Sequence, residues 1–146
     1  MANGYDEAIK DLREYRDLKT ALINIPDEIA ELEQECGAVK SVRYDKTPVM
    51  GGTSGYEDAL ILNIDRRNRL AIRLDTAKSK INRIDRGLSG LTETERLILR
   101  RFYIDGQRGY LDRLTLELGY ERAQIYRIKD AALQRFVRSM WGVVDA

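Results

Sequence analysis

Hydrophobic residues recur at spacings of three and four along most of the chain, which is the pattern of helices that bury one face. In the first third the pattern is carried by Tyr5, Ile9, Leu12, Leu22, Ile25, Ile29 and Leu32. It predicts one long amphipathic helix from Tyr5 to Cys36. We expect this helix to bend near Pro26, which lacks a backbone donor, and to end near Gly37.

A second long pattern begins after Ser54 and runs to Leu88. Its apolar positions are Leu60, Ile64, Ala71, Leu74, Ile81, Ile84 and Leu88. Each of the two helices is predicted to span about 30 residues, or ~45 Å, and equal lengths joined by a short connection favour an antiparallel pair. The first helix is acidic and the second is basic, as in coiled coils whose flanking charges select the partner. Residues 1–90 are therefore predicted to form a coiled-coil-like helical hairpin. Because a two-helix core is thin and leaves part of its apolar stripe uncovered, we expect the hairpin to form a homodimer or to dock on a neighbour.

The connection between the two helices, residues 37–55, contains Pro48 and clustered glycines and is predicted to be a loop. A phosphate-binding loop is disfavoured, because no Gly-Lys-Ser/Thr sequence is present and no strand precedes it. The segment Tyr44-Asp45-Lys46 is either an epitope for a partner or a solvated crossover anchored by Tyr44 and Val49. The sequence leaves its role open.

Residues 91–146 have a different organisation, with three shorter helices separated by glycines. The helices are expected near residues 92–105, 110–118 and 121–141, and Thr92 with Glu95 matches a capping box at the start of the first. Gly119 follows the second helix, at a position where a left-handed residue ends a helix and glycine adopts that conformation at low cost. Strand patterns are absent, so the predicted fold class is all-α.

Charge is distributed unevenly, although the net charge of the chain is only +1. Through Cys36 there are ten acidic and four basic residues, whereas from Gly37 to Leu91 there are eleven basic and six acidic ones. The remainder has ten basic and eight acidic residues. The net charge of the whole protein therefore says nothing about nucleic acid, while the charge of individual segments permits a local basic face.

Several function classes are disfavoured by composition. No apolar run is long enough to cross a membrane and no secretory leader is present, so a cytoplasmic protein is expected. Cys36 is the only cysteine and the chain has no histidine. A disulfide within the chain and a zinc site are thus excluded, and Cys36 is expected to cap an apolar stripe. No nucleophile with a base and no distinctive carboxylate pair stands out, so neither an enzyme nor a cofactor is expected.

The segment around Gly119 has the three parts of a helix-turn-helix, which are a support helix, a tight turn and a helix whose first residues reach base edges in the major groove. Leu114, Ile125 and Ile128 stand at the offsets that bury the inner faces of such a pair. The opposite stripe of the last helix carries arginine and glutamine, whose forked ends can bond two acceptors of guanine or bracket adenine. The alternative is a structural pair of helices with a solvated, charged face.

Leu91–Tyr103 and Arg122–Leu133 resemble region 4 of bacterial primary sigma factors, the helix-turn-helix that reads the upstream promoter element. Over nearly its whole length the chain resembles, more loosely, phage-encoded regulators of the ArpU and RinA type from temperate phages and prophages of Gram-positive bacteria. Members of that family are regarded as activators of late phage genes. The resemblance implies a transcriptional regulator in the host cell, bound to double-stranded DNA and in contact with host RNA polymerase. The regions by which a full sigma factor binds core polymerase are missing, which implies an accessory regulator.

The resemblance also implies particular contacts with DNA. The residues expected to contact bases are Arg122, Ala123, Gln124, Tyr126 and Arg127. Beyond the family's own contacts, the hypothesis of a DNA-binding protein assigns phosphate contacts to Arg108, Arg113 and Lys129. Glu121 stands where the family usually has a capping Ser or Thr, Ala123 replaces a polar reader, and Thr115 replaces a common Ala. The recognised DNA sequence therefore cannot be inherited from the family.

The remaining aromatic side chains are assigned by their spacing. Aromatic residues at helical spacing in a small domain usually build its core, and we expect Tyr103 and Trp141 to do so. Tyr110 and Tyr120 are left undecided between core and DNA.

Two other functions remain open at this stage. A small terminase subunit of a DNA-packaging machine also joins a helix-turn-helix to helical oligomerisation segments, and it predicts a ring of many subunits. A helical adaptor that does not bind DNA would instead contact RNA polymerase through the sigma-like tail.

Overall fold

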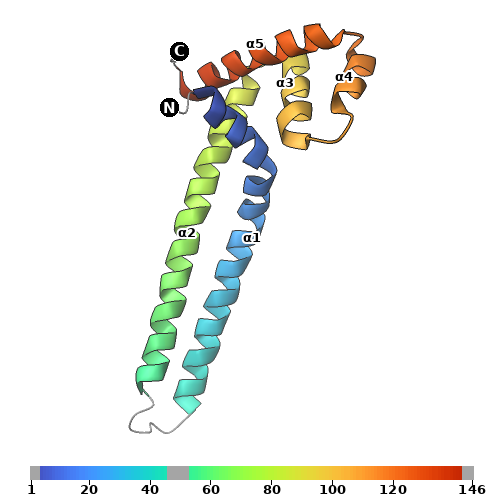
Figure 1. The fold of residues 1–146 in the computed structure, drawn as a ribbon. Coiled ribbons are helices and arrows are strands. Elements are labelled where there is room, and N and C mark those ends of the chain that lie inside the picture. The colour runs from blue at the N-terminus through green and yellow to red at the C-terminus, as the bar shows by residue number, and fades with distance from the viewer. Residues whose placement is uncertain (1–3, 46–52, 143–146) are drawn as a thin grey trace. The chain divides into compact units, whose positions relative to one another are not determined.

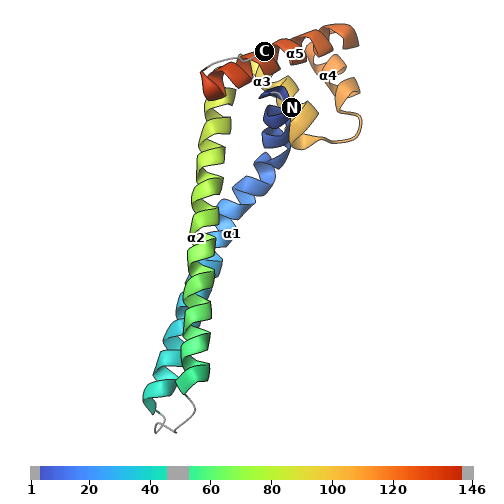
Figure 2. The ribbon, with the colours of Figure 1, turned by 60° about the vertical axis from the view of Figure 1, so that its left-hand side comes forward.

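The computed structural model describes residues 4–45 and 53–142, and every regular element within them is helical (Figures 1 and 2). The elements are α1 (Gly4–Asp45), α2 (Thr53–Ser89), α3 (Glu93–Leu99), the π-helical segment η1 (Arg100–Asp105), α4 (Tyr110–Leu118) and α5 (Arg122–Trp141). The predicted all-α class is confirmed. Over the same residues, no helix carries an apolar stretch that would span a bilayer.

The chain forms two compact units, each described here by itself. The first unit joins the part up to Leu18 to the part from Ser79 onward, and the second unit is the continuous stretch Lys19–Lys78. The second unit is thus an insertion within the first, and both long helices contribute to both units. The division into residues 1–90 and 91–146, expected from the sequence, stays a prediction.

The second unit consists of the facing parts of α1 and α2, which run side by side in opposite directions in both views (Figures 1 and 2). Ile25 and Leu32 of α1 pack against Leu70 of α2, and all three are buried. The side-chain amide of Asn63 donates a hydrogen bond of 2.8 Å to the carbonyl oxygen of Leu32. Arg67 in turn donates from Nε to Oδ1 of Asn63 at 2.9 Å. Packing and a short polar network therefore hold the two helices in register.

The predicted end of the first helix at Gly37 is wrong, and so is the predicted extent of the loop. The helix continues through Gly37 to Asp45, and α2 begins at Thr53. A single glycine costs a helix only about 1 kcal/mol relative to alanine, so a helix can continue through it. Residues 46–52 lie outside the described residues, and the roles considered for Tyr44-Asp45-Lys46 stay predictions.

The core of the first unit joins residues from both ends of the chain. Leu12 of α1, Ile84 of α2 and Phe136 of α5 are all fully buried. A Cβ atom added at Gly87 would lie 2.6 Å from side-chain atoms of Phe136 and Met140. Glycine at this position therefore allows α2 and α5 to approach each other closely.

The start of α3 is fixed by the predicted capping box, which is confirmed. The amide of Glu95 donates to Oγ1 of Thr92 at 3.2 Å, and the amide of Thr92 donates to Oε1 of Glu95 at 3.1 Å. The same oxygen of Glu95 accepts from Nη1 of Arg135 at 3.1 Å. The cap therefore also ties α3 to α5, which is the reason that a carboxylate is buried here.

One further carboxylate, Asp11, is buried in the first unit and only 9% exposed. Burial raises its pKa above the ordinary value, because a charged carboxylate is poorly solvated there. The nearby charges of Arg83 and Lys80 oppose this rise without cancelling it, while those of Glu14 and Glu7 add to it. Between the ordinary and the raised pKa, the folded protein therefore binds more protons at Asp11 than the unfolded chain does.

Asp11 should consequently lower the stability of the fold as the pH rises through this window. Its favourable state is fully populated below the ordinary pKa of aspartate and is lost above the raised one. We expect Asp11→Asn to increase the midpoint of thermal unfolding at pH 7 relative to the wild type, and to do so less near pH 4. Asp17→Asn, at an exposed acid of the same helix, is the control and should show no such trend. A gain for Asp11→Asn that is the same at both pH values would contradict this explanation.

Candidate nucleic-acid interface

The turn between α4 and α5 is built by a glycine. Gly119 has a φ of 70°, in the left-handed region, and its amide donates to the carbonyl oxygen of Thr115 at 3.0 Å. Glu121 is extended and its side chain makes no capping bond, after which α5 opens at Arg122. The sequence predicted that Glu121, in place of a Ser or Thr, would not cap α5, and this is confirmed. The turn depends on the backbone conformation of Gly119 rather than on a capping side chain.

A small apolar cluster fixes the direction of α5. Ile98 of α3, Leu114 of α4 and Ile125 of α5 are all 0% exposed and pack together. Leu118 and Ile128, which are partly buried, pack against them. Because Ile125 points into this cluster, the residues on either side of it along α5 must point away.

The outward face at the start of α5 contains all five predicted base-contacting residues. The exposed members are Arg122, Ala123, Gln124, Tyr126 and Arg127. They occupy the first two turns of a 20-residue helix. At 3.6 residues per turn they cover more than half of the circumference of α5, on every side except that of Ile125, and we call this exposed part of the helix the α5 face.

Arg122 is engaged on this face rather than free. Its Nη2 atom pairs with Oδ1 of Asp112 in α4, and both side chains are well exposed, at 63% and 69%. An exposed ion pair of this kind contributes between about 0 and 1 kcal/mol. Another acceptor can therefore replace Asp112 beside Arg122 at small cost.

Lys129 lies apart from the other predicted phosphate contacts, because its side chain is only 18% exposed. Its ammonium group lies 5.6 Å from the ring centroid of Phe102 and 5.4 Å from that of Tyr126, and it pairs with Asp130 at 2.9 Å. Burial lowers the pKa of Lys129, but the hydrogen bond to Asp130 and the nearby hydroxyls of Tyr103 and Tyr126 outweigh it and raise the pKa overall. Lys129 is thus a charged group that supports the α5 face from beneath.

The two other predicted phosphate contacts are exposed at the opposite end of α4. Arg108 lies in the turn before α4, and Arg113 lies in its first turns. Nη1 of Arg113 donates to Oε1 of Gln107 at 3.3 Å. The two arginines therefore lie at the end of α4 remote from Gly119, whereas the α5 face begins just beyond that glycine.

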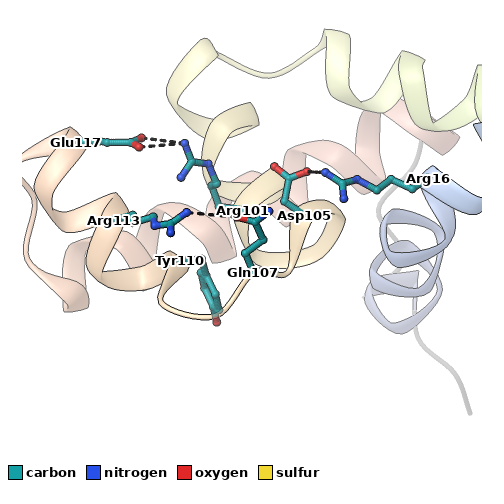
Figure 3. A pocket seen from close by; sticks show the side chains of 7 residues that line it. All are labelled: Arg16, Arg101, Asp105, Gln107, Tyr110, Arg113 and Glu117. Carbon is teal, nitrogen blue, oxygen red and sulfur yellow. Dashed lines mark hydrogen bonds and ion pairs between the residues drawn. The ribbon is translucent and has the colours of Figure 1, made fainter.

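Sequence reasoning missed a polar pocket of about 300 Å³ beside Arg113, which Figure 3 shows. Its lining residues are Arg16, Arg101, Asp105, Gln107, Tyr110, Arg113 and Glu117. Nη2 of Arg101 donates to both carboxylate oxygens of Glu117, at 3.0 and 3.2 Å, and Nη2 of Arg16 pairs with Asp105 at 2.5 Å. The π-helical turn of η1 carries Arg101 and Asp105, so helical spacing alone gave no signal for this arrangement.

The aromatic residues divide between support and surface. Phe102 makes edge contacts with Tyr110 and Tyr126, at centroid distances of 4.9 and 5.7 Å. Tyr103 is partly buried against Phe102 at 5.9 Å. Tyr120 is partly buried beside the cluster of Ile98, Leu114 and Ile125. Tyr110 and Tyr120, undecided from the sequence, thus pack within the domain.

The prediction that Trp141 belongs to the core is wrong, because its side chain is 47% exposed. The guanidinium carbon of Arg83 lies 4.4 Å from the centre of the indole ring. Trp141 is the last residue of α5, where helical packing covers one side only, and the arginine covers the ring by a cation–π contact.

No protein-family model matches the chain, and no curated protein or solved structure matches it significantly. The arrangement of the α5 face, the glycine turn and the two arginines beside α4 is therefore the basis on which a function is proposed. It offers a projecting helix with two arginines, a glutamine and a tyrosine on a rigid support.

The buried cluster generates a first prediction for this site. Leu114→Ala should lower the free energy of unfolding by about 2 to 5 kcal/mol, because it leaves a cavity between three helices. Leu116→Ala removes the same atoms two residues later on a side chain that is 84% exposed, and it should change stability by less than about 0.5 kcal/mol. Chemical denaturation of both variants checks this, and equal losses would mean that the cluster does not hold the helices.

The glycine turn generates a second prediction. Gly119→Ala should destabilise the fold by about 1 to 2 kcal/mol through backbone strain alone, because no atom lies within 4 Å of the added Cβ. Gly37→Ala, within helix α1 and equally unobstructed, should instead stabilise by about 0.5 to 1 kcal/mol. Thermal unfolding of the two variants should therefore shift in opposite directions, and a Gly119→Ala protein as stable as the wild type would exclude the strained turn.

Proposed function

We propose that this protein is a sequence-specific DNA-binding regulator of transcription that activates late genes of a phage or prophage. The observation that carries the proposal is the α5 face, where exposed Arg122, Gln124 and Arg127 surround a fully buried Ile125. A rigid helix that presents such side chains suits the major groove. The likeness of this part of the chain to region 4 of sigma factors supports a promoter as the target.

In this proposal α4, Gly119 and α5 form a helix-turn-helix, and α5 is the recognition helix. Arg127, which lies one turn beyond Arg122 and Ala123, reads a base edge, and Gln124 brackets an adenine. Tyr126 contributes an apolar edge, since its ring is held by Phe102 but remains 43% exposed. The α5 face would thus supply the sequence-specific contacts.

Phosphates would be held beside the groove by Arg108 and Arg113, which lie at the far end of α4. Contacts of this kind fix the register of the protein on the duplex without reading sequence. Lys129 is too enclosed to serve in the same way, and we assign it to the support of Tyr126. When DNA arrives, Arg122 would exchange Asp112 for an acceptor on the duplex, an exchange between a weak surface pair and a stronger charge-assisted one.

The regulator would act as a homodimer through the hairpin formed by α1 and α2, so that each subunit presents one recognition helix. Two half-sites related by a two-fold axis would follow from that symmetry. Host RNA polymerase is the second partner, in keeping with the likeness to a sigma region that lies next to polymerase. A regulator of this kind would assist polymerase rather than replace its sigma factor.

The proposal predicts that Arg127→Ala weakens binding to a preferred duplex by about 1 to 3 kcal/mol, because a base contact is lost. The preferred duplex is obtained by selecting a random library on the wild-type protein. Arg138→Ala removes the same charge from the last turn of α5 and should leave this affinity nearly unchanged. Arg113→Ala should instead weaken binding to the preferred and to a scrambled duplex equally, since it acts on phosphates. Gel retardation and fluorescence anisotropy provide the measurements.

Three outcomes would overturn the proposal or replace it. Equal losses for Arg127→Ala and Arg138→Ala would show that the α5 face does not read bases. A ring of many subunits bound near a packaging site would favour a small terminase subunit. If no duplex is retarded at low salt while polymerase is captured, the protein is an adaptor that does not bind DNA.

A further inference from the structure

The hairpin of the second compact unit carries two ridges of opposite charge, and all of their members are exposed. The acidic ridge on α1 consists of Glu28, Glu31 and Glu35. The basic ridge on α2 consists of Arg66, Arg69 and Arg73. Within each ridge the residues follow one another at steps of three and four, so they lie along one side of their helix. Among the residues that the structure describes, no ion pair joins the two ridges, and the one pair made by a ridge member joins Arg69 to Asp65 of the same helix.

Both ridges lie on the same side of the hairpin and at the same level along it. A hollow of about 310 Å³ is lined by Glu35 of the acidic ridge and by Arg66 of the basic one. Because α1 and α2 run in opposite directions (Figures 1 and 2), both ridges extend from this hollow toward the same end of the hairpin. The acidic ridge continues four and seven residues from Glu35, and the basic ridge continues three and seven residues from Arg66. The ridges therefore match level for level over about 10 Å.

The hollow is apolar inside and has an exposed leucine on its wall. Its apolar lining residues are Leu32, Cys36, Ala59, Leu60 and Leu62. Leu62 stands four residues before Arg66, in line with the basic ridge, and is 65% exposed. The same side of the hairpin thus offers both an apolar recess and an apolar projection to water, and covering them would be favourable.

Each ridge is unfavourable by itself, because like charges three or four residues apart on one helix repel each other. The pair of Arg69 with Asp65 relieves little of this repulsion, since the two side chains are 71% and 55% exposed and water screens their attraction. A ridge of opposite charge placed over each of them would relieve the repulsion on both helices. The hairpin therefore lacks a partner that presents an acidic and a basic ridge side by side.

We propose that this side of the hairpin binds a second copy of this chain about a two-fold axis parallel to the helices. We call it the two-ridge face, which comprises the two ridges, Leu62 and the hollow. The rotation exchanges the positions of α1 and α2 and keeps every level, so the acidic ridge lies opposite the partner's basic ridge. Glu35 then meets the partner subunit's Arg66, Glu28 meets the partner subunit's Arg73, and Leu62 reaches the partner's hollow. Such a contact is isologous, as a closed dimer requires.

The charges select this axis and this partner. A two-fold axis across the helices would set α1 on α1 and α2 on α2, so that each ridge would face a ridge of its own sign. A nucleic acid is disfavoured on this face, because the acidic ridge stands beside the basic one. A second copy supplies both ridges at the required levels and converts a thin pair of helices into a four-helix bundle whose neighbours differ in charge. The inference rests on the homodimer of the proposed function and specifies its contact, and it does not depend on DNA binding.

The two-ridge face is tested by charge reversal in the full chain, with the mass measured by light scattering over a range of concentrations and without DNA. We expect the wild type to be a dimer at micromolar concentration. Arg66→Glu/Arg73→Glu should raise the dissociation constant of the dimer by more than about tenfold, because it sets acids against the partner's acidic ridge. Lys78→Glu/Arg86→Glu is the control. It changes the net charge equally at two exposed residues of α2 outside the ridge, and it should leave the dissociation constant within about twofold of the wild type.

A complementary variant tests the pairing of opposite ridges. Glu28→Arg/Glu35→Arg should also weaken its own dimer, because both of its ridges are then basic. Mixed in equal amounts with Arg66→Glu/Arg73→Glu, it should give a one-to-one heterodimer with nearly the wild-type dissociation constant, since every acid again faces a base. A chain with all four substitutions should dimerise with itself for the same reason. It keeps the charge balance of the wild type, so it remains a test if circular dichroism shows that either double variant folds poorly.

Each part of the inference has an outcome that would overturn it. A monomeric wild type would overturn the dimer. A dimer that survives Arg66→Glu/Arg73→Glu, or that is weakened equally by Lys78→Glu/Arg86→Glu, would overturn the two-ridge face. If the mixture of the two double variants and the chain with all four substitutions both stay monomeric, opposite ridges do not pair between subunits.

These failures are distinguishable from failure of the DNA proposal. Arg127→Ala should keep the wild-type dissociation constant of the dimer while losing affinity for the preferred duplex. A protein that dimerises as described but retards no duplex would retain the two-ridge face and lose the proposed function. One that binds the preferred duplex as a monomer would lose the two-ridge face and retain DNA binding.

Discussion

The burial of Ile125 against Ile98 and Leu114 is the contact on which the candidate interface depends. The backbone of a helix does not determine which of its sides faces outward. In α5 the fully buried Ile125, near the start of the helix, determines it. Because Ile125 is buried, the side chains of Arg122, Gln124 and Arg127 point toward solvent. The charged pair between Arg122 and Asp112 is a consequence of that orientation, and it is too weak to be its cause.

The surroundings of this contact are arranged to keep it rigid. The capping box of Thr92 and Glu95 begins α3 and reaches α5 through Arg135, while the ring of Phe102 lies against Tyr110 and Tyr126. Polar and aromatic groups thus brace the same three helices that the small apolar cluster joins. Such bracing would favour the proposed role of α5 in binding, because a side chain that is already ordered loses less entropy when it binds.

Much of the helical layout could be predicted from the sequence, because it follows from local signals. The left-handed Gly119, the capping box and the stripes of α4 and α5 all act within a few residues, and the structure has them where they were expected. The predicted end of the first helix at Gly37 was wrong because glycine weakens a helix without necessarily ending it. The prediction for Trp141 was wrong because spacing shows which face of α5 the residue lies on, but not how far along that face other helices pack against it. The pairs of Arg101 with Glu117 and of Arg16 with Asp105 span 16 and 89 residues and involve a π-helical turn. No sequence period predicts them, and a base-contacting role for the α5 residues likewise cannot be read from spacing alone.

The insertion of one compact unit into the other has a consequence for the order in which the chain can fold during synthesis. The inserted unit has all its residues in one continuous stretch, so its contacts can form as soon as that stretch has left the ribosome. The first unit has no such opportunity, because it joins the part up to Leu18 to the part from Ser79 onward, and its buried residues, such as Leu12 and Phe136, come from both parts. The start of α1 therefore stays uncovered until α5, which approaches it where Gly4 lies beside Val137, has also been synthesised.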